Sequence, residues 1–329
     1  MAKKYYIYYH GDLDGMAAAY LLRRFLLRKG FEVEYGAALE YSPTIQEAWV
    51  TYPFKEPFIL VDFQNHPRAA GFIDHHESNR PTTDLSHLDF YYFDSSLSSA
   101  AAAVAALAKR EGVALGRVTR LIRQASIVDS GDFRRSGIKP LDVVCPQDAF
   151  LKVFAIIDHD YNYAEMAVHR LTNPGFFGII YGEMFDRRLE KLVADPFFIR
   201  KFRVIERETQ TVLASFPLVS HEEGELVIYD DSDLPFNRFV PAVFYPQSLL
   251  WSGISKHKNG FSVKANLNPW AAPEKVHELF VERGLHLGQI MKRHGGGGHA
   301  RVGATTVTSR AEAEKVLESV LSELRPFLK

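Results

Sequence analysis

Short β-rich runs alternate with helical patterns over the first part of the chain, and this alternation constrains the fold more than any other feature. Strands are expected at 5–9, 31–39, 58–62, 71–74 and 91–93, and helices at 16–28, 43–50, 98–111 and 117–128. Strands that alternate with helices in this way usually form a parallel sheet covered by helices. We therefore predict an α/β fold with a doubly wound, mainly parallel sheet.

The rest of the chain follows a different pattern. It is almost wholly helical from about 141 to 216, and 196–216 reads as one long helix. Strand patterns at 226–229, 239–244, 249–255 and 261–266 follow, together with helical patterns at 274–283, 287–294 and 310–324. A chain of 329 residues is long enough for two hydrophobic cores. We predict a first domain at 1–195, a connecting helix at 196–216 and a smaller α/β domain at 217–329.

Charge and composition narrow the functional classes. The formal net charge is −1 and the pI is about 6.9, whereas a protein that tracks long nucleic acid usually carries a basic excess. Any nucleic-acid substrate is therefore expected to be short. The chain has one cysteine, no apolar leader pattern and no uncharged apolar run of membrane-spanning length. We expect a cytoplasmic protein without a membrane partner.

Acidic and histidine residues gather at the ends of the predicted elements. The clusters are His10, Asp12 and Asp14; Asp62; Asp74, His75 and His76; and Asp129. Ligands of an open α/β sheet bind outside the carboxyl ends of its strands, so three of these clusters are expected to meet there. Crowded carboxylates repel one another unless divalent cations lie between them. The pattern therefore predicts a metal site.

The spacing of Asp12 and Asp14 favours two cations over one. In an extended loop, the two side chains would point roughly the same way and each would serve one ion of a pair about 3.5–4 Å apart. Mixed histidine and carboxylate ligands favour two Mn²⁺ ions, with Mg²⁺, Co²⁺, Zn²⁺ and Fe²⁺ as alternatives. A single Asp after a strand is usually a turn or cap residue, so the prediction depends on all four clusters together. The triplet Asp158-His159-Asp160 lies in the helical region and is interpreted as structural.

A glycine run stands near the end of the chain, at Gly295 to Gly298, and is followed by His299 and Arg301. Glycines let backbone N–H groups approach an anion closely, and the two side chains add donors beside them. Read alone, the run is compatible with a flexible loop. Together with a metal site in the first domain, it predicts a phosphate or nucleotide cradle.

These motifs resemble those of a known family. His10-Gly-Asp12-Leu-Asp14-Gly15, Asp62, Asp74-His75-His76 and Asp129-Ser-Gly resemble the four motifs of the DHH phosphoesterases, and Gly295 to Gly303 resembles the signature of their C-terminal DHHA1 domain. Family members hydrolyse phosphodiester or phosphoanhydride bonds with two Mn²⁺ ions. They include oligoribonucleases, cyclic dinucleotide phosphodiesterases, single-strand DNA exonucleases, exopolyphosphatases and pyrophosphatases.

The resemblance implies a role for each residue. His10, Asp12 and Asp62 would bind one metal ion, and Asp14, Asp62, His75 and Asp129 would bind the other. Asp62 and His76 are the expected catalytic residues, and His76 would face the substrate phosphate. The expected substrate contacts are His76, Arg134, Lys264, Asn266, Gly296, Gly297, Gly298, His299 and Arg301. Several members carry an arginine on the strand before the glycine run; this chain has none there, and Lys264 or Asn266 would replace it.

The resulting functional prediction is a hydrolase that acts on phosphodiester or phosphomonoester bonds of short oligonucleotides or phosphorylated nucleotides, with water activated by two metal ions. The alternatives are a cyclic dinucleotide phosphodiesterase, an exopolyphosphatase, and a non-catalytic nucleotide-binding protein. The first domain would be catalytic, the second would bind substrate, and a homodimer is compatible with the sequence.

Overall fold

The computed structural model describes residues 2–39, 43–82, 84–163, 193–235, 237–257 and 260–328. These residues form two compact units. The first contains Met1–Asp132, and the second contains Phe133–Tyr163 and Pro196–Lys329. The segment 133–163, which we expected within the first domain, therefore packs with the second unit.

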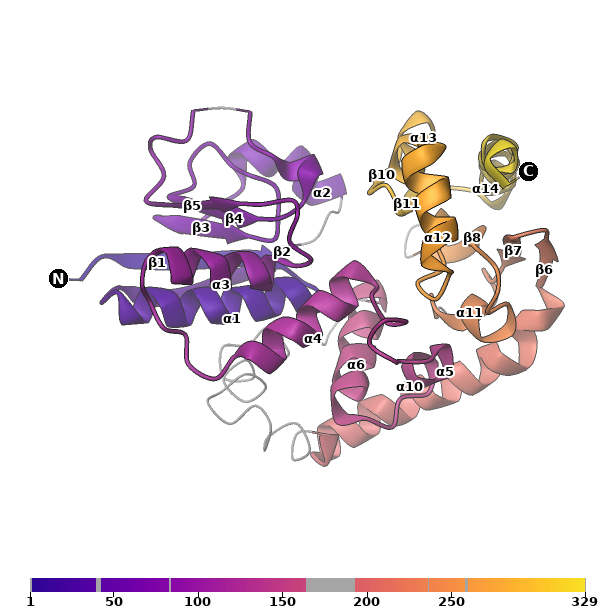
Figure 1. Ribbon diagram of the computed structural model, residues 1–329, viewed down its shortest axis with the longest axis horizontal. Coiled ribbons are helices and arrows are strands. Elements are labelled where there is room, and N and C mark those ends of the chain that lie inside the picture. Colours follow the sequence, from indigo (N-terminus) through magenta and orange to yellow (C-terminus); the bar gives the residue numbers. More distant parts are fainter. Residues whose placement is uncertain are drawn as a thin grey trace. The chain divides into compact units, whose positions relative to one another are not determined.

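The first unit is built on a five-stranded sheet. Its strands are β1 (Lys4–His10), β2 (Glu32–Leu39), β3 (Phe58–Val61), β4 (Gly71–Asp74) and β5 (Phe90–Phe93). The spatial order is β2-β1-β3-β4-β5, and every neighbouring pair is parallel (Figure 1). The predicted parallel α/β architecture is confirmed.

Both faces of this sheet are covered. The helices of the unit are α1 (Leu13–Arg28), α2 (Pro43–Glu47), α3 (Ala100–Arg110) and α4 (Thr119–Ser130), with the short 3-10 helices η1 (Trp49–Thr51) and η2 (Glu77–Asn79). Helices α1 and α3 pack together on one face, where their many buried alanines allow close approach (Figure 1). The other face buries an aromatic cluster that includes Tyr8, Phe54, Phe58 and Phe72. Because the sheet is buried on both sides, β3 is a continuous apolar run rather than an alternating one, and every residue of β4 is buried as well.

The strand order locates the crevice where ligands are expected. Strand β1 lies between β2 and β3, so the chain crosses to opposite sides of β1 at this point. In sheets of this order, the loops after the two central strands separate and leave a crevice outside their carboxyl ends. His10 is the last residue of β1, and Asp62 directly follows β3. Two of the predicted clusters thus lie at the topological switch point.

The second unit contains a six-stranded sheet in the order β10-β11-β9-β8-β7-β6. The strands are β6 (Ser220–Glu223), β7 (Leu226–Asp230), β8 (Leu250–His257), β9 (Gly260–Leu267), β10 (Gly297–Gly298) and β11 (Val302–Val307). The β7–β8 pair is parallel and the other pairs are antiparallel. One face packs on α13 (Leu287–Arg293) and α14 (Arg310–Leu324), with Leu250, Ile254 and Val263 among the buried residues.

The remaining helices of this unit are α5 (Pro140–Val144), α6 (Ala149–Tyr163), α10 (Pro196–Ser215), α11 (Val240–Phe244) and α12 (Pro273–His277), with the short helices η3 (Phe216–Leu218), η4 (Glu278–Glu282) and η5 (Arg325–Leu328). The predicted strand at 239–244 is wrong, because this segment forms α11. Pro241 stands at the start of the helix, where its missing N–H costs nothing, and a short apolar run does not distinguish helix from strand. Among the helices of the described residues, none is long and apolar enough to cross a membrane.

Candidate metal centre

Asp62 lies at the centre of the site and has an unusual backbone. Its φ angle is 58°, in the left-handed region that non-glycine residues seldom adopt. Its N–H donates to the carbonyl of Ile73 (3.0 Å), which fixes the turn that follows β3. Both carboxylate oxygens are fully buried and accept no hydrogen bond within the described residues. Backbone strain and a buried carboxylate whose oxygens accept no hydrogen bond are both costly, and such features cluster at functional sites.

One group of ligand atoms forms around His10, Asp12 and Asp62. The Nδ1 atom of His10 lies 3.1 Å from Oδ2 of Asp12 and 3.8 Å from Oδ2 of Asp62. Asp12 is also the N-cap of α1, and its Oδ1 accepts the N–H of Gly15 (2.9 Å). A Cβ at Gly15 would lie 2.3 Å from the carbonyl oxygen of His10, so only glycine permits this tight turn from β1 into α1.

A second group contains Asp14, His75 and Asp129. The Nε2 atom of His75 lies 3.3 Å from Oδ2 of Asp129, 3.9 Å from Oδ2 of Asp14 and 3.9 Å from Oδ1 of Asp62. Asp129 is in the last turn of α4 rather than after the helix, because α4 continues to Ser130.

The prediction that Asp12 and Asp14 share an extended loop is wrong. Helix α1 begins at Leu13, so Asp14 lies in its first turn while Asp12 caps it. The two carboxylates consequently belong to different groups of ligand atoms. The helix start, rather than an alternating loop, separates them.

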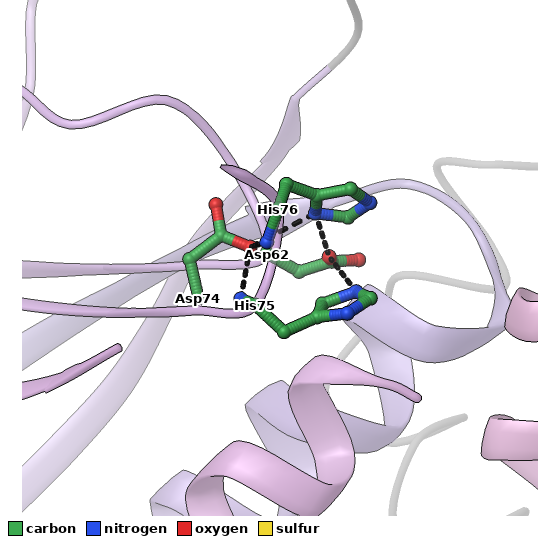
Figure 2. Close-up of side chains that lie close together, drawn as sticks. All are labelled: Asp62, Asp74, His75 and His76. Atoms are coloured by element: carbon green, nitrogen blue, oxygen red, sulfur yellow. Dashed lines mark hydrogen bonds and ion pairs between the residues drawn. The ribbon is translucent and has the colours of Figure 1, made fainter. Parts of the chain in front are cut away.

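Asp74 organises the two histidines that follow it. Its Oδ1 accepts the N–H groups of His75 (2.6 Å) and His76 (3.0 Å) and contacts Nδ1 of His76 (2.9 Å). Its Oδ2 accepts from the side chain of Asn79 (2.7 Å). Figure 2 shows the result: the rings of His75 and His76 lie on opposite sides of the Asp62 carboxylate, which is 3.3 Å from Nδ1 of His76.

Burial and mutual repulsion shift the pKa values of the carboxyl groups. Burial, together with the charge of Asp12, raises the pKa of Asp62 to about 6. Burial and the neighbouring carboxylates also raise the pKa values of Asp14 and Asp129. Burial alone would raise the pKa of Asp12 as well, but the charge and hydrogen bond of His10 outweigh burial and lower it. A divalent cation among these carboxylates would replace their mutual repulsion with attraction.

The two histidines have opposite pKa shifts. Burial, together with the charge of His76, lowers the pKa of His75 to about 4, so His75 is neutral near pH 7 and able to coordinate a cation. Burial would also lower the pKa of His76, but its hydrogen bond to Asp74 and the charges of Asp62 and Asp74 raise it to about 9. His76 is therefore protonated near pH 7 and suited to meet an anion.

The donor set fits divalent cations. Ligand atoms lie within 4.8 Å of one another in each of three groups: His10, Asp12 and Asp62; Asp14, His75 and Asp129; and Asp62, Asp74, His75 and His76. Asp62 belongs to the first group, and its Oδ1 lies 3.9 Å from Nε2 of His75 in the second. The Nε2 atom of His75 is likewise buried without a hydrogen-bond partner within the described residues. Imidazole nitrogens mixed with carboxylate oxygens suit Mn²⁺ and related transition metals.

The predicted substrate contacts at the glycine run lie in the second unit. A Cβ at Gly296 would lie 2.1 Å from the carbonyl oxygen of Ala304, and one at Gly298 would lie 2.2 Å from that of Val302. These two glycines are therefore required by packing against β11. A Cβ at Gly297 would meet nothing within 4 Å, so packing does not explain its identity. His299 and Arg301 are exposed beside it.

The other predicted contacts of the second unit are Arg134, which has a protein partner, and Lys264 and Asn266, which lie on β9. Nη1 of Arg134 donates to the carbonyl of Trp270 (3.0 Å), so this side chain has a structural role. Lys264 lies on β9 opposite Gly253, and burial lowers its pKa to about 8 despite the nearby charge of Asp231. Asn266 is opposite Trp251 on the same face of the sheet.

The triplet that we interpreted as structural also has partners. Asp158 pairs with Arg238 (2.9 Å), and His159 contacts Glu208 (2.8 Å). Both residues line a small cavity of the second unit.

Sequence reasoning missed the groups that position the ligands. Asp74 is fully buried and forms hydrogen bonds with His75, His76 and Asn79, but no role of its own was predicted for it from the sequence. The carbonyl of Leu97 and the N–H groups of Ala100 and Ala101 also contact ligand residues. Contacts made by backbone groups cannot be recognised from residue types. The role of Asp74 could have been inferred, because it is an Asp at the end of a buried strand with Asn79 five residues later.

Three solved structures resemble the chain over nearly its whole length. The pGpG-specific phosphodiesterase PggH from Vibrio cholerae has a TM-score of 0.66 at 15% identity, covering 98% of this chain and 99% of that one. The chain has the fold of this enzyme. RecJ from Thermus thermophilus in complex with Mn²⁺ has a TM-score of 0.59 at 14% identity, covering 99% of this chain and 52% of that one. An exonuclease RecJ bound to manganese has a TM-score of 0.54 at 14% identity, covering 98% of this chain and 90% of that one.

These matches confirm the predicted two-part α/β fold and, at the level of fold, the resemblance to phosphoesterases. Comparison of the sequence with protein-family models gave no match, and neither did a search among curated proteins. At 14–15% identity, the likeness lies in the backbone and leaves the chemistry to be argued from the residues.

Proposed function

We propose that the chain is a metal-dependent phosphoesterase that hydrolyses short oligonucleotides or phosphorylated nucleotides. One observation carries the proposal: the buried carboxylate of Asp62 lies between two groups of ligand atoms and accepts no hydrogen bond within the described residues. A carboxylate in that position is suited to bridge two cations. The fold, shared with a phosphodiesterase and with exonucleases, supports the same chemistry.

His10, Asp12 and Asp62 would hold one cation, and Asp14, His75 and Asp129 would hold the other, with Asp62 shared. A pair of divalent cations at such a site activates water near neutral pH and stabilises negative charge on a phosphoryl group. Mn²⁺ is the proposed physiological ion because two histidines belong to the donor set.

His76 would bind the substrate phosphate. Its Nδ1 is held by Asp74, which fixes the ring and favours the charged form of the imidazole. A protonated imidazole beside the ligand groups can hydrogen-bond a phosphoryl oxygen and stabilise the charge that grows there in the transition state. Asp74 thereby acts through His76, as the residue that orients it and keeps it protonated.

A short linear dinucleotide is the leading substrate. PggH, a structural neighbour that matches nearly the full length of both chains, is specific for pGpG, and the net charge of −1 does not favour a long polyanion. The second unit would contribute phosphate contacts through Gly297, His299 and Arg301, with Lys264 and Asn266 as further candidates. Arg134 is a weaker candidate because its guanidinium already contacts Trp270.

The experiment is a turnover assay with Mn²⁺ on a panel: pGpG, 3′-phosphoadenosine-5′-phosphate, cyclic dinucleotides, polyphosphate and single-stranded DNA. We expect hydrolysis of the linear dinucleotide and its loss in Asp62→Ala and His76→Ala. His87→Ala is the matched control, since His87 is an exposed histidine on the next loop. Turnover of none of the panel would refute the enzymatic proposal, and a preference for cyclic dinucleotides or polyphosphate would select an alternative activity.

Three further expectations belong to this proposal. The first unit would be the catalytic part, and the second unit, which contains 133–163 as well as 196–216 and 217–329, would be the substrate-binding part. The single cysteine fits a cytoplasmic location, because it allows no intrachain disulfide. A homodimer is the proposed assembly, and light scattering of the purified chain would test it.

A further inference from the structure

A short segment before and within the first turn of α3 contacts two of the proposed ligand residues. The carbonyl of Leu97 lies 3.1 Å from Nδ1 of His75. The N–H groups of Ala100 and Ala101 donate to the two oxygens of Asp14, at 2.5 and 3.0 Å. The segment 97–101 therefore touches both His75 and Asp14 through backbone groups.

Each of these contacts has a defined effect on a ligand. The carbonyl of Leu97 accepts a hydrogen bond from Nδ1 of His75, so the ring proton stays on Nδ1 and the lone pair is on Nε2, the atom that faces Asp14 and Asp129. The two N–H groups belong to the N-terminus of α3, where the helix dipole favours a negative charge. They orient the Asp14 carboxylate across a sequence separation of 86 residues.

The third ligand, Asp129, is reached through side chains. Ser99 is fully buried and is the N-cap of α3, and its Oγ accepts the N–H of Ala102 (3.1 Å). The same Oγ lies 2.8 Å from Oγ of Ser126 on α4. Ser126 is three residues before Asp129, so both side chains lie on the same side of α4. The hydroxyl pair thus fixes the rotation of α4 at the point where it presents Asp129.

We propose that Ser99 and Ser126 are positioning residues for the cation group formed by Asp14, His75 and Asp129. The hydroxyl pair joins the helix that orients Asp14 to the helix that carries Asp129. The group formed by His10, Asp12 and Asp62 has no residue on α3 or α4, because His10 and Asp62 lie at the ends of β1 and β3 and Asp12 caps α1. The inference rests on the proposed function, and it predicts an effect confined to one of the two cations.

The test measures Mn²⁺ affinity by calorimetry in backgrounds that keep one group each. Asp12→Asn leaves the Asp14 group intact, and Asp129→Asn leaves the His10 group intact. Adding Ser126→Ala to Asp12→Asn is expected to weaken Mn²⁺ binding about 10- to 100-fold, as loss of outer-shell partners typically does. Adding it to Asp129→Asn is expected to leave the affinity unchanged. Ser126→Ala spares the N-cap at Ser99, so α3 stays capped.

Two matched variants separate positioning from a general loss of structure. Ser130→Ala makes the same chemical change next to Asp129, but the hydroxyl of Ser130 donates within α4 to the carbonyl of Ser126 (2.5 Å). It is expected to leave Mn²⁺ affinity unchanged. Ser126→Thr keeps a hydroxyl and is expected to restore most of the affinity.

Equal weakening in both backgrounds, or no weakening in the Asp12→Asn background, would overturn the positioning role. Failure of the wild-type chain to bind Mn²⁺ would instead overturn the proposed function itself.

Discussion

Asp62 makes a quantitative prediction about the metal-free protein. Its carboxyl group is fully buried and has a pKa of about 6, against 3.8 for the unperturbed group. A carboxyl group whose pKa is higher in the folded state than in the unfolded state binds its proton more tightly when folded. Its contribution to stability is therefore lost as the pH rises from the unfolded pKa to the folded one.

The size of the loss follows from the shift. One pKa unit corresponds to about 1.36 kcal/mol, so the whole shift costs the ionised protein about 3 kcal/mol. Between about pH 4 and pH 6.5, the cost grows by about 2 kcal/mol. The range ends there because His76, whose pKa is raised to about 9, begins to lose its own stabilising contribution above the unfolded histidine value of 6.5.

The assay is chemical denaturation of wild type and Asp62→Asn in EDTA at several pH values. Asn has nearly the same volume and does not titrate, so its pH-independent effect on packing cancels in the slope. We expect the stability of Asp62→Asn relative to wild type to rise by about 2 kcal/mol across this range. With saturating Mn²⁺ the contribution of Asp62 to the wild-type slope should vanish, because the cation holds Asp62 ionised. A difference that is flat with pH in EDTA, or that falls, would refute the reasoning.

Four other outcomes are expected. His76→Gln should lower kcat about 10²- to 10⁴-fold, the usual range for a lost proton donor, while Mn²⁺ binding measured by calorimetry is retained; unchanged kcat would contradict the phosphate role. Asp74→Asn should lower the pKa of His76, visible by NMR titration, because it removes the negative partner of Nδ1. Gly296→Ala should cost about 1–3 kcal/mol through overpacking against Ala304, measured by denaturation. Gly297→Ala should leave stability unchanged and raise KM; equal destabilisation by both glycine variants would refute the distinction.

Much of the site could be predicted because the chemistry lies in side chains of a distinctive type. His10, Asp62 and His75 stand at or after the ends of buried strands, and a parallel sheet brings those ends together whatever the intervening sequence. The fold was predictable because short strand patterns alternate with helical ones, and β3 is an apolar run long enough for a strand and too short for a helix.

The rest depended on information that local patterns do not carry. Whether Asp14 lies in a loop or a helix is decided by where α1 begins. Asp12 caps the helix at that point, and the sequence predicted it only as a ligand. The segment 239–244 was wrongly predicted as a strand because its six residues satisfy the periodicity of a strand and of a helix equally well. The grouping of 133–163 with the second unit reflects packing, such as Phe133 stacked on Trp270, between residues far apart in sequence.

The two cation groups differ in what the chain must build to obtain them. The first needs the ends of two adjacent central strands and the start of α1, which follows β1 directly. The second also needs α3 and α4 to meet at one hydroxyl pair. Substitutions in those helices could therefore abolish one cation while the sheet and the other cation survive. The fold thus offers a short mutational route between two-cation and one-cation chemistry, and residues 97–130 are where evolutionary divergence of that kind would be found.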